Sequence, residues 1–442
     1  MSGLRKGWVQ ASIRDLCELI NGKAFKPSDW TPEGLPIVRI QNLNNPNSAF
    51  NHYQGLVEEK FLIEDGQLLF AWSGTPGTSF GAHVWNGGRA VLNQHIFKVN
   101  FPLNLINKHF LRNAINQKLE ELIGKAHGGA GLQHVTKGKF EDTLIYLPPL
   151  AEQNRIVAKL DALNAKSARA RTELARIETL VSRYKQAVLS KAFSGELVGL
   201  APHVTEKPHA LCWDLPSGWR WVAFEDAVEI ASNLVSPDTI PELPHIAPDN
   251  IESGTARLLP FKTIGEDGVI SAKHRFFSGQ ILYSKIRPYL RKAVIADFDG
   301  ACSADMYPLS PRDVLSARYL LQWLVSEQFM HFAVEHQGRT VLPKINQSAL
   351  NKTPLPLPPL ATQHEIVRRI ESAFARIDRL AKEAKRALEL VGRLDEAILA
   401  KAFRGELVPQ DEIDEPAEHL LARIRAEREA APKGKRGRKA TI

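Results

Sequence analysis

Basic and aromatic side chains cluster between residues 262 and 292, and this mixture is suited to binding nucleic acid. Arginine can donate two hydrogen bonds to the O6 and N7 atoms of guanine, and lysine pairs with phosphate groups. The cluster holds Lys262, Lys273, Arg275, Lys285, Arg287, Arg291 and Lys292 against Glu266 and Asp267, with Tyr283 and Tyr289 interleaved. A solvated strand face is the alternative reading of any single member. Together the residues predict a DNA-binding patch.

Amide, hydroxyl and aromatic side chains follow two apolar segments in the first third of the chain. Asparagine and glutamine can pair with the N6 and N7 atoms of adenine. The candidates are Arg39, Gln41, Asn42 and Asn44, then Trp72, Ser73 and Thr75. Further candidates lie near a glycine cluster, at His127, His134 and Lys137, and in a later loop, at Lys344 and Asn346. Single residues of these types also form ordinary loops and turns, so both readings stay open.

No catalytic motif is present in the sequence. It lacks a GxxxxGK[ST] phosphate loop, the Asn-Pro-Pro-aromatic motif of amino-methyltransferases, HExxH and GxSxG. Cys17, Cys212 and Cys302 are far apart and show no CxxC spacing, which argues against a disulfide framework and a zinc site. We therefore expect no catalytic residue, no metal site and no cofactor bound by this chain.

The composition is that of a globular protein of two or three domains, with 442 residues, 44% of them hydrophobic and 24% charged. The sequence has neither an apolar run of 18 or more residues nor the apolar core of a secretory signal, so we expect a cytoplasmic location. A net charge of +8 permits a polyanionic partner. Because residues 200–356 carry 15 basic and 17 acidic residues, DNA binding there requires a local patch.

A gapless internal repeat organises the chain. Residues 147–163, LPPLAEQNRIVAKLDAL, recur at 357–373 as LPPLATQHEIVRRIESA, and AVLSKAFSGELV at 187–198 recurs at 397–408 as AILAKAFRGELV. Between residues 147–198 and 357–408, 24 of 52 positions are identical. The period of 210 residues is too long for a solenoid.

Each repeated unit is predicted to be a long helix, because apolar residues recur with alternating steps of four and three, the spacing of a coiled-coil seam. The first seam is Ile156, Leu160, Leu163, Ser167, Ala170, Leu174, Ile177, Val181, Tyr184 and Val188, and the second is Ile366, Ile370, Ala373, Ile377, Leu380, Ala384, Ala387, Val391, Leu394 and Ile398. Gly195 and Gly405 suit C-terminal caps. An ordinary amphipathic helix is the alternative, but the length and the second copy favour an antiparallel helix pair.

The segments before the two helices look like diverged versions of one mixed domain. Each opens with Gly-Trp, at Gly7 and Gly218, and continues to a Leu-Pro strand and a Gly-Gln strand. Alternation predicts strands over 37–43, 67–72 and 280–283, and periodicity predicts helices over 106–123 and 316–331. We expect an α+β fold in which two similar mixed α/β domains are separated by two long helices that pack as an antiparallel coiled coil. The expected divisions are 1–146, 147–199, 200–356, 357–408 and a charged tail, 409–442.

The tail consists of an acidic stretch, DEIDEP, a predicted helix, AEHLLARIRAEREA, and a basic end, APKGKRGRKATI. We expect such an end to be disordered by itself. It could make sequence-independent phosphate contacts, attach to a partner through Leu420, Leu421 and Ile424, or serve only as a solubilising tail.

The LPPLAEQ and LPPLATQ openings, the KAFSGEL and KAFRGEL endings, the stretch GQILYSKIRPYLRK at 279–292 and the charged tail resemble the specificity (S) subunits of type I restriction-modification systems. The resemblance covers essentially the whole chain. It implies a non-catalytic subunit in which two target-recognition domains, 1–146 and 200–356, each bind half of a bipartite, asymmetric DNA site.

The resemblance also implies the partners of such a chain. The two long helices would set the gap between the half-sites and hold two methyltransferase subunits, and two restriction subunits would join that core. S-adenosylmethionine, ATP and Mg²⁺ would then be bound by those subunits. A different class of function stays open at this point: a coiled-coil scaffold whose end domains bind proteins instead of DNA.

Overall fold

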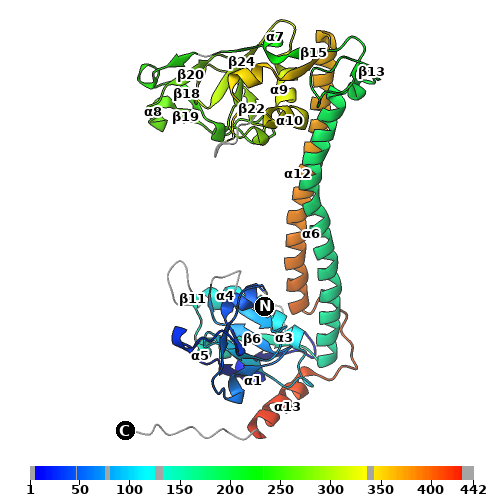
Figure 1. Ribbon diagram of the computed structural model, residues 1–442. Helices are drawn as coiled ribbons and strands as arrows, with labels where there is room; N and C mark the ends of the chain where they lie inside the picture. The colour runs from blue at the N-terminus through cyan, green and yellow to red at the C-terminus, as the bar shows by residue number, and fades with distance from the viewer. Residues whose placement is uncertain are drawn as a thin grey trace. The chain divides into compact units, whose positions relative to one another are not determined.

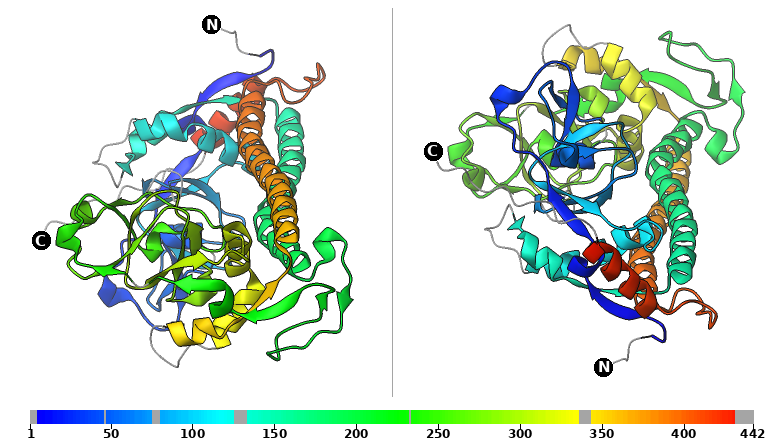
Figure 2. Two further views of the ribbon diagram at one scale, coloured as in Figure 1. Left: turned by 90° about the horizontal axis from the view of Figure 1, so that it is seen from above. Right: turned by 90° about the horizontal axis from the view of Figure 1, so that it is seen from below.

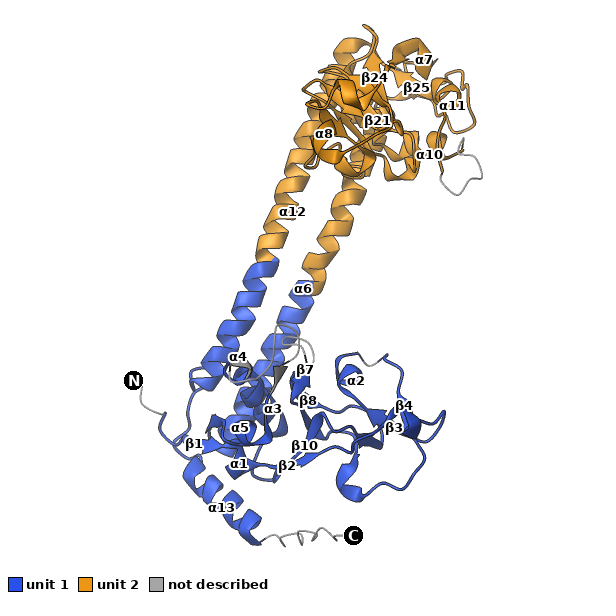
Figure 3. Ribbon diagram, turned by 90° about the vertical axis from the view of Figure 1, so that its left-hand side faces the viewer, with its two compact units in different colours: residues 1–171, 388–442 blue, residues 172–387 orange. Residues whose placement is uncertain are grey.

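The structure, a computed structural model, describes residues 5–45, 47–74, 80–124, 133–231, 233–335 and 343–430 of the chain. The chain divides into two compact units, unit 1 with residues 1–171 and 388–442 and unit 2 with residues 172–387 (Figure 3). The division crosses two long helices, so each unit contains part of both. None of the described helices is long and apolar enough to cross a membrane.

Unit 1 contains two four-stranded sheets. The first is antiparallel, with the order β2 (Glu18–Asn21), β10 (Ile96–Asn100), β6 (Leu68–Ala71) and β8 (Gly81–Val84). The second has the order β4 (Asn51–Tyr53), β3 (Leu35–Val38), β9 (Ala90–Leu92) and β5 (Leu62–Ile63), and only its β3–β9 pair is parallel. The other strands among the described residues of unit 1 form two short pairs: β1 (Val9–Ser12) with β12 (Leu144–Leu147), and β7 (Ser73–Gly74) with β11 (Gln133–His134).

Short helices connect these strands, namely α1 (Ile13–Leu16), α2 (Ile40–Asn44), α3 (Lys108–Gln117), α4 (Leu119–Gly124) and α5 (Lys137–Glu141), with 3-10 turns at Pro27–Asp29 and Glu59–Phe61. The core between the first sheet and α5 is aromatic: the Phe70 and Phe140 rings stack with their centroids 3.7 Å apart, beside Phe97. The structure divides the predicted helix over 106–123 at Lys118, into α3 and α4. The predicted strand over 37–43 is wrong beyond Val38, because the Asn42 side chain accepts from the Arg39 backbone N–H and starts α2.

Unit 2 repeats this arrangement. One sheet has the order β16 (Val228–Ile230), β24 (Met306–Pro311), β21 (Ile281–Ser284) and β22 (Ala293–Ile295). The other has the order β17 (Leu234–Val235), β20 (Lys273–Phe276), β23 (Gly300–Cys302), β18 (Pro244–Ile246) and β19 (Lys262–Thr263). The short pairs are β15 (Arg220–Ala223) with β25 (Pro354–Leu357) and β13 (Pro202–His203) with β14 (Leu215–Pro216).

The helices of unit 2 are α7 (Phe224–Ala227), α8 (Ile264–Asp267), α9 (Ala317–Leu324), α10 (Glu327–Glu335) and α11 (Gln347–Asn351), with 3-10 turns at Glu196–Val198, Pro237–Thr239, Pro248–Asn250 and Pro288–Leu290. As expected, the Gly-Gln strands β6 and β21 take the same place in their sheets, and the Leu-Pro strands β3 and β18 each pair in parallel with a strand, β9 or β23. The prediction of two diverged copies of one mixed domain is confirmed.

The repeated segments form two 44-residue helices, α6 (Leu150–Phe193) and α12 (Leu360–Phe403), which run side by side in both views of Figure 2. In unit 1 Arg171 pairs with Asp395 at 2.7 Å, and in unit 2 Lys185 pairs with Asp378 at 2.6 Å. From the first pair to the second, the residue number rises along α6 and falls along α12. The predicted antiparallel packing is therefore confirmed. Gly195 and Gly405 have left-handed backbones (φ 88° and 72°) just after the helices.

The ends of both helices belong to the domain cores. In unit 1 the start of α6, with Ile156 and Leu160, shares one core with the end of α12, where Phe403 packs 5.6 Å from the Phe110 ring. In unit 2 the roles are exchanged: Ile366 and Ile370 of α12 share a core with Phe193 of α6. Each domain therefore holds the beginning of one helix and the end of the other.

The middle of the predicted seam needs a correction. Leu174, Ile177 and Val181 of α6 and Ile377, Ala387 and Val391 of α12 are partly buried, but the predicted seam residues Tyr184, Leu380 and Leu394 are 59%, 62% and 54% exposed. Between Ile377 and Ile398, the partly or fully buried positions are Ala381, Ala384, Ala387, Leu388, Val391, Gly392, Asp395 and Ile398. Steps of four, three and four between Ile370, Phe374, Ile377 and Ala381 span eleven residues, which fits a straighter helix than a strict heptad does.

The C-terminal helix α13 (Ala417–Ala430), labelled near the red end of the chain in Figure 1, is part of unit 1. Leu420, Leu421 and Ile424 are at most 5% exposed and belong to the unit 1 core. These three side chains therefore serve the chain's own fold and are not available to attach a partner, which was one of the alternatives. The expectation of a tail that is disordered by itself is wrong for residues 417–430, which form a packed helix. The basic end at 431–442 lies outside the described residues.

Candidate nucleic-acid interface

The hairpin between β21 and β22 carries the most exposed part of the predicted patch. Its turn contains Pro288–Leu290, flanked by Arg287 and Arg291, whose backbones both lie in the left-handed region (φ 48° and 50°). Arg287 is exposed, and the Tyr289 side chain is 48% exposed. An arginine and a tyrosine at a hairpin tip can enter a groove and contact base edges or stack on a base.

The segment with the predicted residues Lys344 and Asn346 is hydrogen-bonded to this hairpin. The Arg287 N–H donates to the Pro343 carbonyl at 2.7 Å, and the Ile345 N–H donates to the Lys285 carbonyl at 2.9 Å. Lys344, which is exposed, thus lies beside the hairpin, and the Lys285 ammonium lies 5.1 Å from the centre of the Tyr307 ring. Asn346 caps α11 through its side chain. The structure therefore brings Lys285, Arg287 and Lys344 together.

Three other basic residues of the cluster are engaged within unit 2. The Lys292 ammonium donates to the Pro248 carbonyl at 2.7 Å, and Arg291, 18% exposed, lies 3.7 Å from Glu327. Lys273 is 4% exposed and bonds Ser271, and burial lowers the pKa of its ammonium. Tyr283 is buried, which raises the pKa of its phenol. These side chains support the fold more than they offer a surface.

A row with three polar side chains, those of Arg275, His245 and Lys262, crosses the five-stranded sheet of unit 2. Arg275 is opposite Ala301, Ala301 is opposite His245, and His245 is opposite Lys262, so the four side chains share one face of the sheet. His245 Nδ1 lies 2.7 Å from Asp267 Oδ2, and Lys262 is exposed. Sequence reasoning found Lys262 and Arg275 but missed His245, which has no basic or aromatic neighbour in the sequence to mark it.

The same place in unit 1 is apolar. Ile37 of β3 pairs with Val91 of β9, in the arrangement that His245 and Ala301 have in unit 2. Ile37 and Val91 are fully buried together with Leu62. The two domains thus share their strand order and differ in the chemistry of matching side chains.

In unit 1 the predicted residues fall into two groups. Arg39 lies over the Trp30 ring, 5.3 Å from its centre, and Gln41 and Asn44 are exposed. Asn42 is 4% exposed and bonds the Ser48 and Ala49 carbonyls, so its amide is occupied within the loop.

The second group surrounds the end of β6. The Val135 N–H donates to the Trp72 carbonyl at 3.1 Å, and the backbone of His134 pairs with that of Ser73, whose side chain is buried. This pairing matches the Lys285–Ile345 hydrogen bond of unit 2, since Trp72 and Lys285 both follow the Gly-Gln strand. The predicted contacts at Thr75 and His127 lie outside the described residues.

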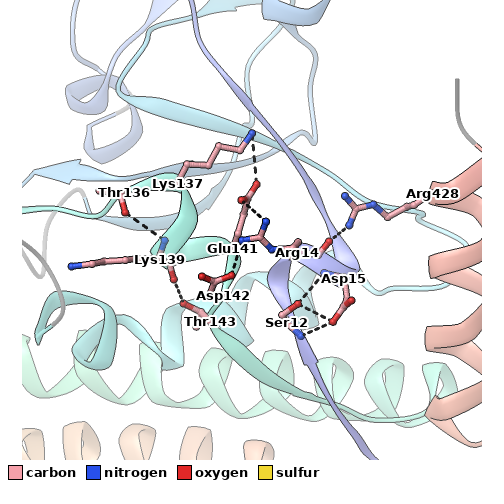
Figure 4. A network of polar contacts seen from close by, with 10 residues as sticks. All are labelled: Ser12, Arg14, Asp15, Thr136, Lys137, Lys139, Glu141, Asp142, Thr143 and Arg428. Carbon is pink, nitrogen blue, oxygen red and sulfur yellow. Dashed lines mark hydrogen bonds and ion pairs between the residues drawn. The ribbon is translucent and has the colours of Figure 1, made fainter. Parts of the chain in front are cut away.

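A polar network ties this loop region to the C-terminal helix (Figure 4). Lys137 donates to the Leu19 carbonyl at 2.8 Å and lies 3.7 Å from Glu141, and Arg14 pairs with Asp142 at 2.6 Å. Arg425 of α13 pairs with Asp15 at 3.2 Å, and Arg428 donates to the Arg14 carbonyl. Helices α5, α1 and α13 are thus linked through charged side chains, and the Lys137 ammonium is engaged inside unit 1.

The described residues contain no group of three or more histidine, cysteine or carboxylate side chains that could hold a metal ion. Cys17, Cys212 and Cys302 are all buried thiols, and burial raises their pKa values to about 12, 11 and 12. Such thiols are poor nucleophiles.

A family model described as the type I restriction modification DNA specificity domain matches residues 5–179 and 254–390. The chain belongs to the specificity subunits of type I restriction-modification systems. The EcoDI specificity subunit of Escherichia coli is 40% identical to this specificity subunit over 357 residues, which are 76% of this chain and 80% of the relative. The EcoBI specificity subunit of Escherichia coli is 28% identical over 99% of this chain and 95% of its own length.

Two solved structures share the fold. The HsdS subunit of Thermoanaerobacter tengcongensis has a TM-score of 0.61 at 22% identity, over 91% of this specificity subunit and 98% of that chain. A chain from a study of complex assembly in a type I restriction-modification system has a TM-score of 0.69 at 22% identity, over 92% of this chain and all of that one.

Proposed function

We propose that this specificity subunit binds double-stranded DNA and recognises a bipartite, asymmetric site, with one half read by each unit. The observation that carries the proposal is the repeated strand order with different side chains at matching positions. Ile37 and Val91 stand where the buried pair of His245 and Ala301 stands in the other unit. On the neighbouring strand, the exposed Lys262 is opposite His245, whereas Asn51 is opposite Ile37. Two domains of one fold that carry different side chains at matching positions are suited to reading two different half-sites.

Exposed residues are the proposed DNA contacts. In unit 2 these are Arg287, Tyr289, Lys344 and Lys262, with Lys285 and Arg275 partly exposed beside them. Arginine suits guanine and lysine suits phosphate. In unit 1 we propose Arg39, Gln41 and Trp72.

The long helices are the proposed attachment site for two methyltransferase subunits, which two restriction subunits would then join. Large apolar side chains are exposed on these helices: Leu180, Tyr184 and Leu380 in unit 2, and Leu390 and Leu394 in unit 1. Exposed apolar groups of this size on paired helices favour burial against another protein. The chain itself is proposed to be non-catalytic, with S-adenosylmethionine, ATP and Mg²⁺ held by the partners.

An exchange of residues 212–356 for the same segment of another specificity subunit tests the division of labour. The chimaera is expressed with the methyltransferase, and the methylated DNA motif is determined. One half-site should change while the other half and the gap stay the same. Changes in both halves would contradict the assignment of one half-site to each unit.

A further inference from the structure

An acidic cavity of about 450 Å³ opens in unit 1 beside the start of α6. Its walls come from three segments: residues 6–9, residues 149–152 and residues 410–418. Hydrogen bonds join the first and third of these segments, because the Gln410 amide donates to the Lys6 carbonyl and the Ala417 N–H donates to the Gly7 carbonyl, both at 2.9 Å. The cavity is therefore built by the fold of unit 1.

Carboxylates dominate the lining of this cavity. The lining contains one ammonium group, that of Lys6, and five carboxylates, those of Glu152, Asp411, Glu412, Asp414 and Glu418. Two of the five have cationic partners: Arg155 forms two hydrogen bonds with Asp414, at 2.6 and 3.2 Å, and Lys6 lies 3.4 Å from Glu412. The remaining negative charge favours a cationic occupant.

Glu152 is the residue that points to a ligand. It is only 1% exposed, its Oε2 accepts a hydrogen bond from Trp8 Nε1 at 3.0 Å, and its Oε1 is buried without a hydrogen-bond partner among the described residues. Burial raises the pKa of this carboxyl, and hydrogen bonding by the Trp8 and Gln410 side chains, together with the charge of Arg155, opposes that effect. A buried carboxylate with one unsatisfied oxygen is costly unless a cation or donor reaches it.

The charge and hydrogen-bonding groups of the cavity restrict the classes of ligand that could occupy it. DNA is repelled by such a wall, and the carboxylates do not form a group that could hold a metal ion among the described residues. A lysine or arginine side chain has the charge and the hydrogen-bond donors that Glu152 Oε1 lacks. The cavity also has room for the chain atoms that carry such a group.

The matching position in unit 2 does not have this carboxylate. Thr362 of α12 corresponds to Glu152 in the internal repeat, whereas Trp219 corresponds to Trp8 and is buried in the same way. The cavity is thus a feature of one copy of the repeat, added to a scaffold that both copies share.

We propose that this Glu152 cavity receives a lysine or arginine side chain from the methyltransferase subunit bound along α6. The inference rests on the proposed function, because it takes α6 as the attachment site. The contact would lie at the start of α6, in unit 1 only. The two methyltransferase subunits would therefore make different contacts with a chain that is otherwise pseudo-symmetric.

The test compares Glu152→Gln with Glu412→Gln in the full chain. Glutamine retains the size of Glu152 and can still accept from Trp8, whereas Glu412 is 90% exposed at the rim. The unfolding midpoint of each free chain is measured, followed by the dissociation constant of its complex with the methyltransferase of the same system. We expect E152Q to leave the midpoint unchanged or higher, because a buried charge is removed, and to weaken the complex at least about tenfold. E412Q should weaken it less than about twofold.

Two results would overturn the inference alone: E152Q binding the methyltransferase as tightly as the original chain, or E152Q lowering the unfolding midpoint, which would assign the carboxylate to the chain's own stability. If the unaltered chain does not bind the methyltransferase, both the inference and the proposed function fail. These outcomes are distinct because the unaltered chain and E412Q are measured alongside.

Discussion

At the residue scale, the hairpin tip of unit 2 combines backbone strain with exposed side chains. A residue with a Cβ in the left-handed region costs about 1 to 2 kcal/mol, and Arg287 and Arg291 both adopt it. The Arg291 side chain lies by Glu327, whereas no ion pair joins the exposed Arg287 side chain to any of the described residues. Strain of this kind gathers at binding sites, which favours Arg287 as a DNA contact.

Replacing Arg287 by glycine should separate stability from binding. Arg287→Gly removes the strained Cβ, so the free energy of unfolding should stay the same or rise by about 1 kcal/mol. DNA affinity of the assembled complex should fall by about 1 to 3 kcal/mol at fixed salt, because a charged contact is lost. Urea unfolding and a DNA titration measure the two effects.

Ala256→Gly is the matched control, since Ala256 also has a left-handed backbone (φ 57°) but no charged side chain. It should change stability in the same direction and leave DNA affinity unaltered. Equal DNA affinity for the Arg287 variant and the original chain would remove this residue from the interface.

At the element scale, the paired helices present one face to each other and leave another open. Ile377 is partly buried in the pair, whereas Leu380, three residues later, is 62% exposed. The apolar pattern alone does not distinguish the two, since both fit a step of four or three. The difference arises because the buried stripe moves by one residue after Ile377.

Aspartate substitutions at these two positions should therefore affect different properties, the stability of the chain at Ile377 and the binding of the methyltransferase at Leu380. Ile377→Asp places a charge in the helix pair and should lower the free energy of unfolding by about 2 to 3 kcal/mol. Leu380→Asp should change it by less than about 0.5 kcal/mol and should instead weaken methyltransferase binding. Thermal unfolding and pull-down of the methyltransferase measure both, and a destabilised Leu380 variant would place that side chain back in the seam.

The C-terminal helix provides a second test at this scale. Leu420→Ala and Ile424→Ala should each lower the free energy of unfolding by about 2 to 4 kcal/mol, because both side chains are buried in the unit 1 core. Removal of residues 431–442 should leave that free energy unchanged. If the two alanine variants unfold like the original chain, α13 is not part of unit 1.

Elements with strong local signals could be predicted from sequence, and features set by tertiary contacts could not. The long helices, the glycines after them and the Gly-Gln strands follow from periodicity and backbone chemistry. The structural role of Gln153 in LPPLAEQ and of Gln363 in LPPLATQ could not be predicted from the sequence. Both side chains are buried and accept hydrogen bonds from the backbone N–H groups of Asn107 and Ser316, at 2.9 and 2.8 Å respectively.

The candidate site was predicted only in part for the same reason. Basic composition marked the β21–β22 hairpin, but it could not show that Lys273 is buried while Arg287 is exposed. His245 and Asp267 are 22 residues apart and meet only because α8 follows the strand next to β18. The Glu152 cavity joins residues 6–9 with 410–418, a contact that no local pattern indicates.

At the scale of the whole molecule, the internal repeat links the two recognition domains to one helix pair. Each unit contains the start of one long helix and the end of the other, so neither domain is complete without residues from both halves of the sequence. Loss of the helix pair should therefore impair both half-sites together, whereas a change at the hairpin tip should affect one.

The central claim is that this specificity subunit determines which DNA sequence its methyltransferase modifies. Single-molecule methylome sequencing of a host that expresses the chain with its methyltransferase, compared with a host that expresses the methyltransferase alone, tests this directly. We predict one bipartite motif, methylated only when the chain is present. An active methyltransferase whose methylation pattern is the same with and without the chain would contradict the account.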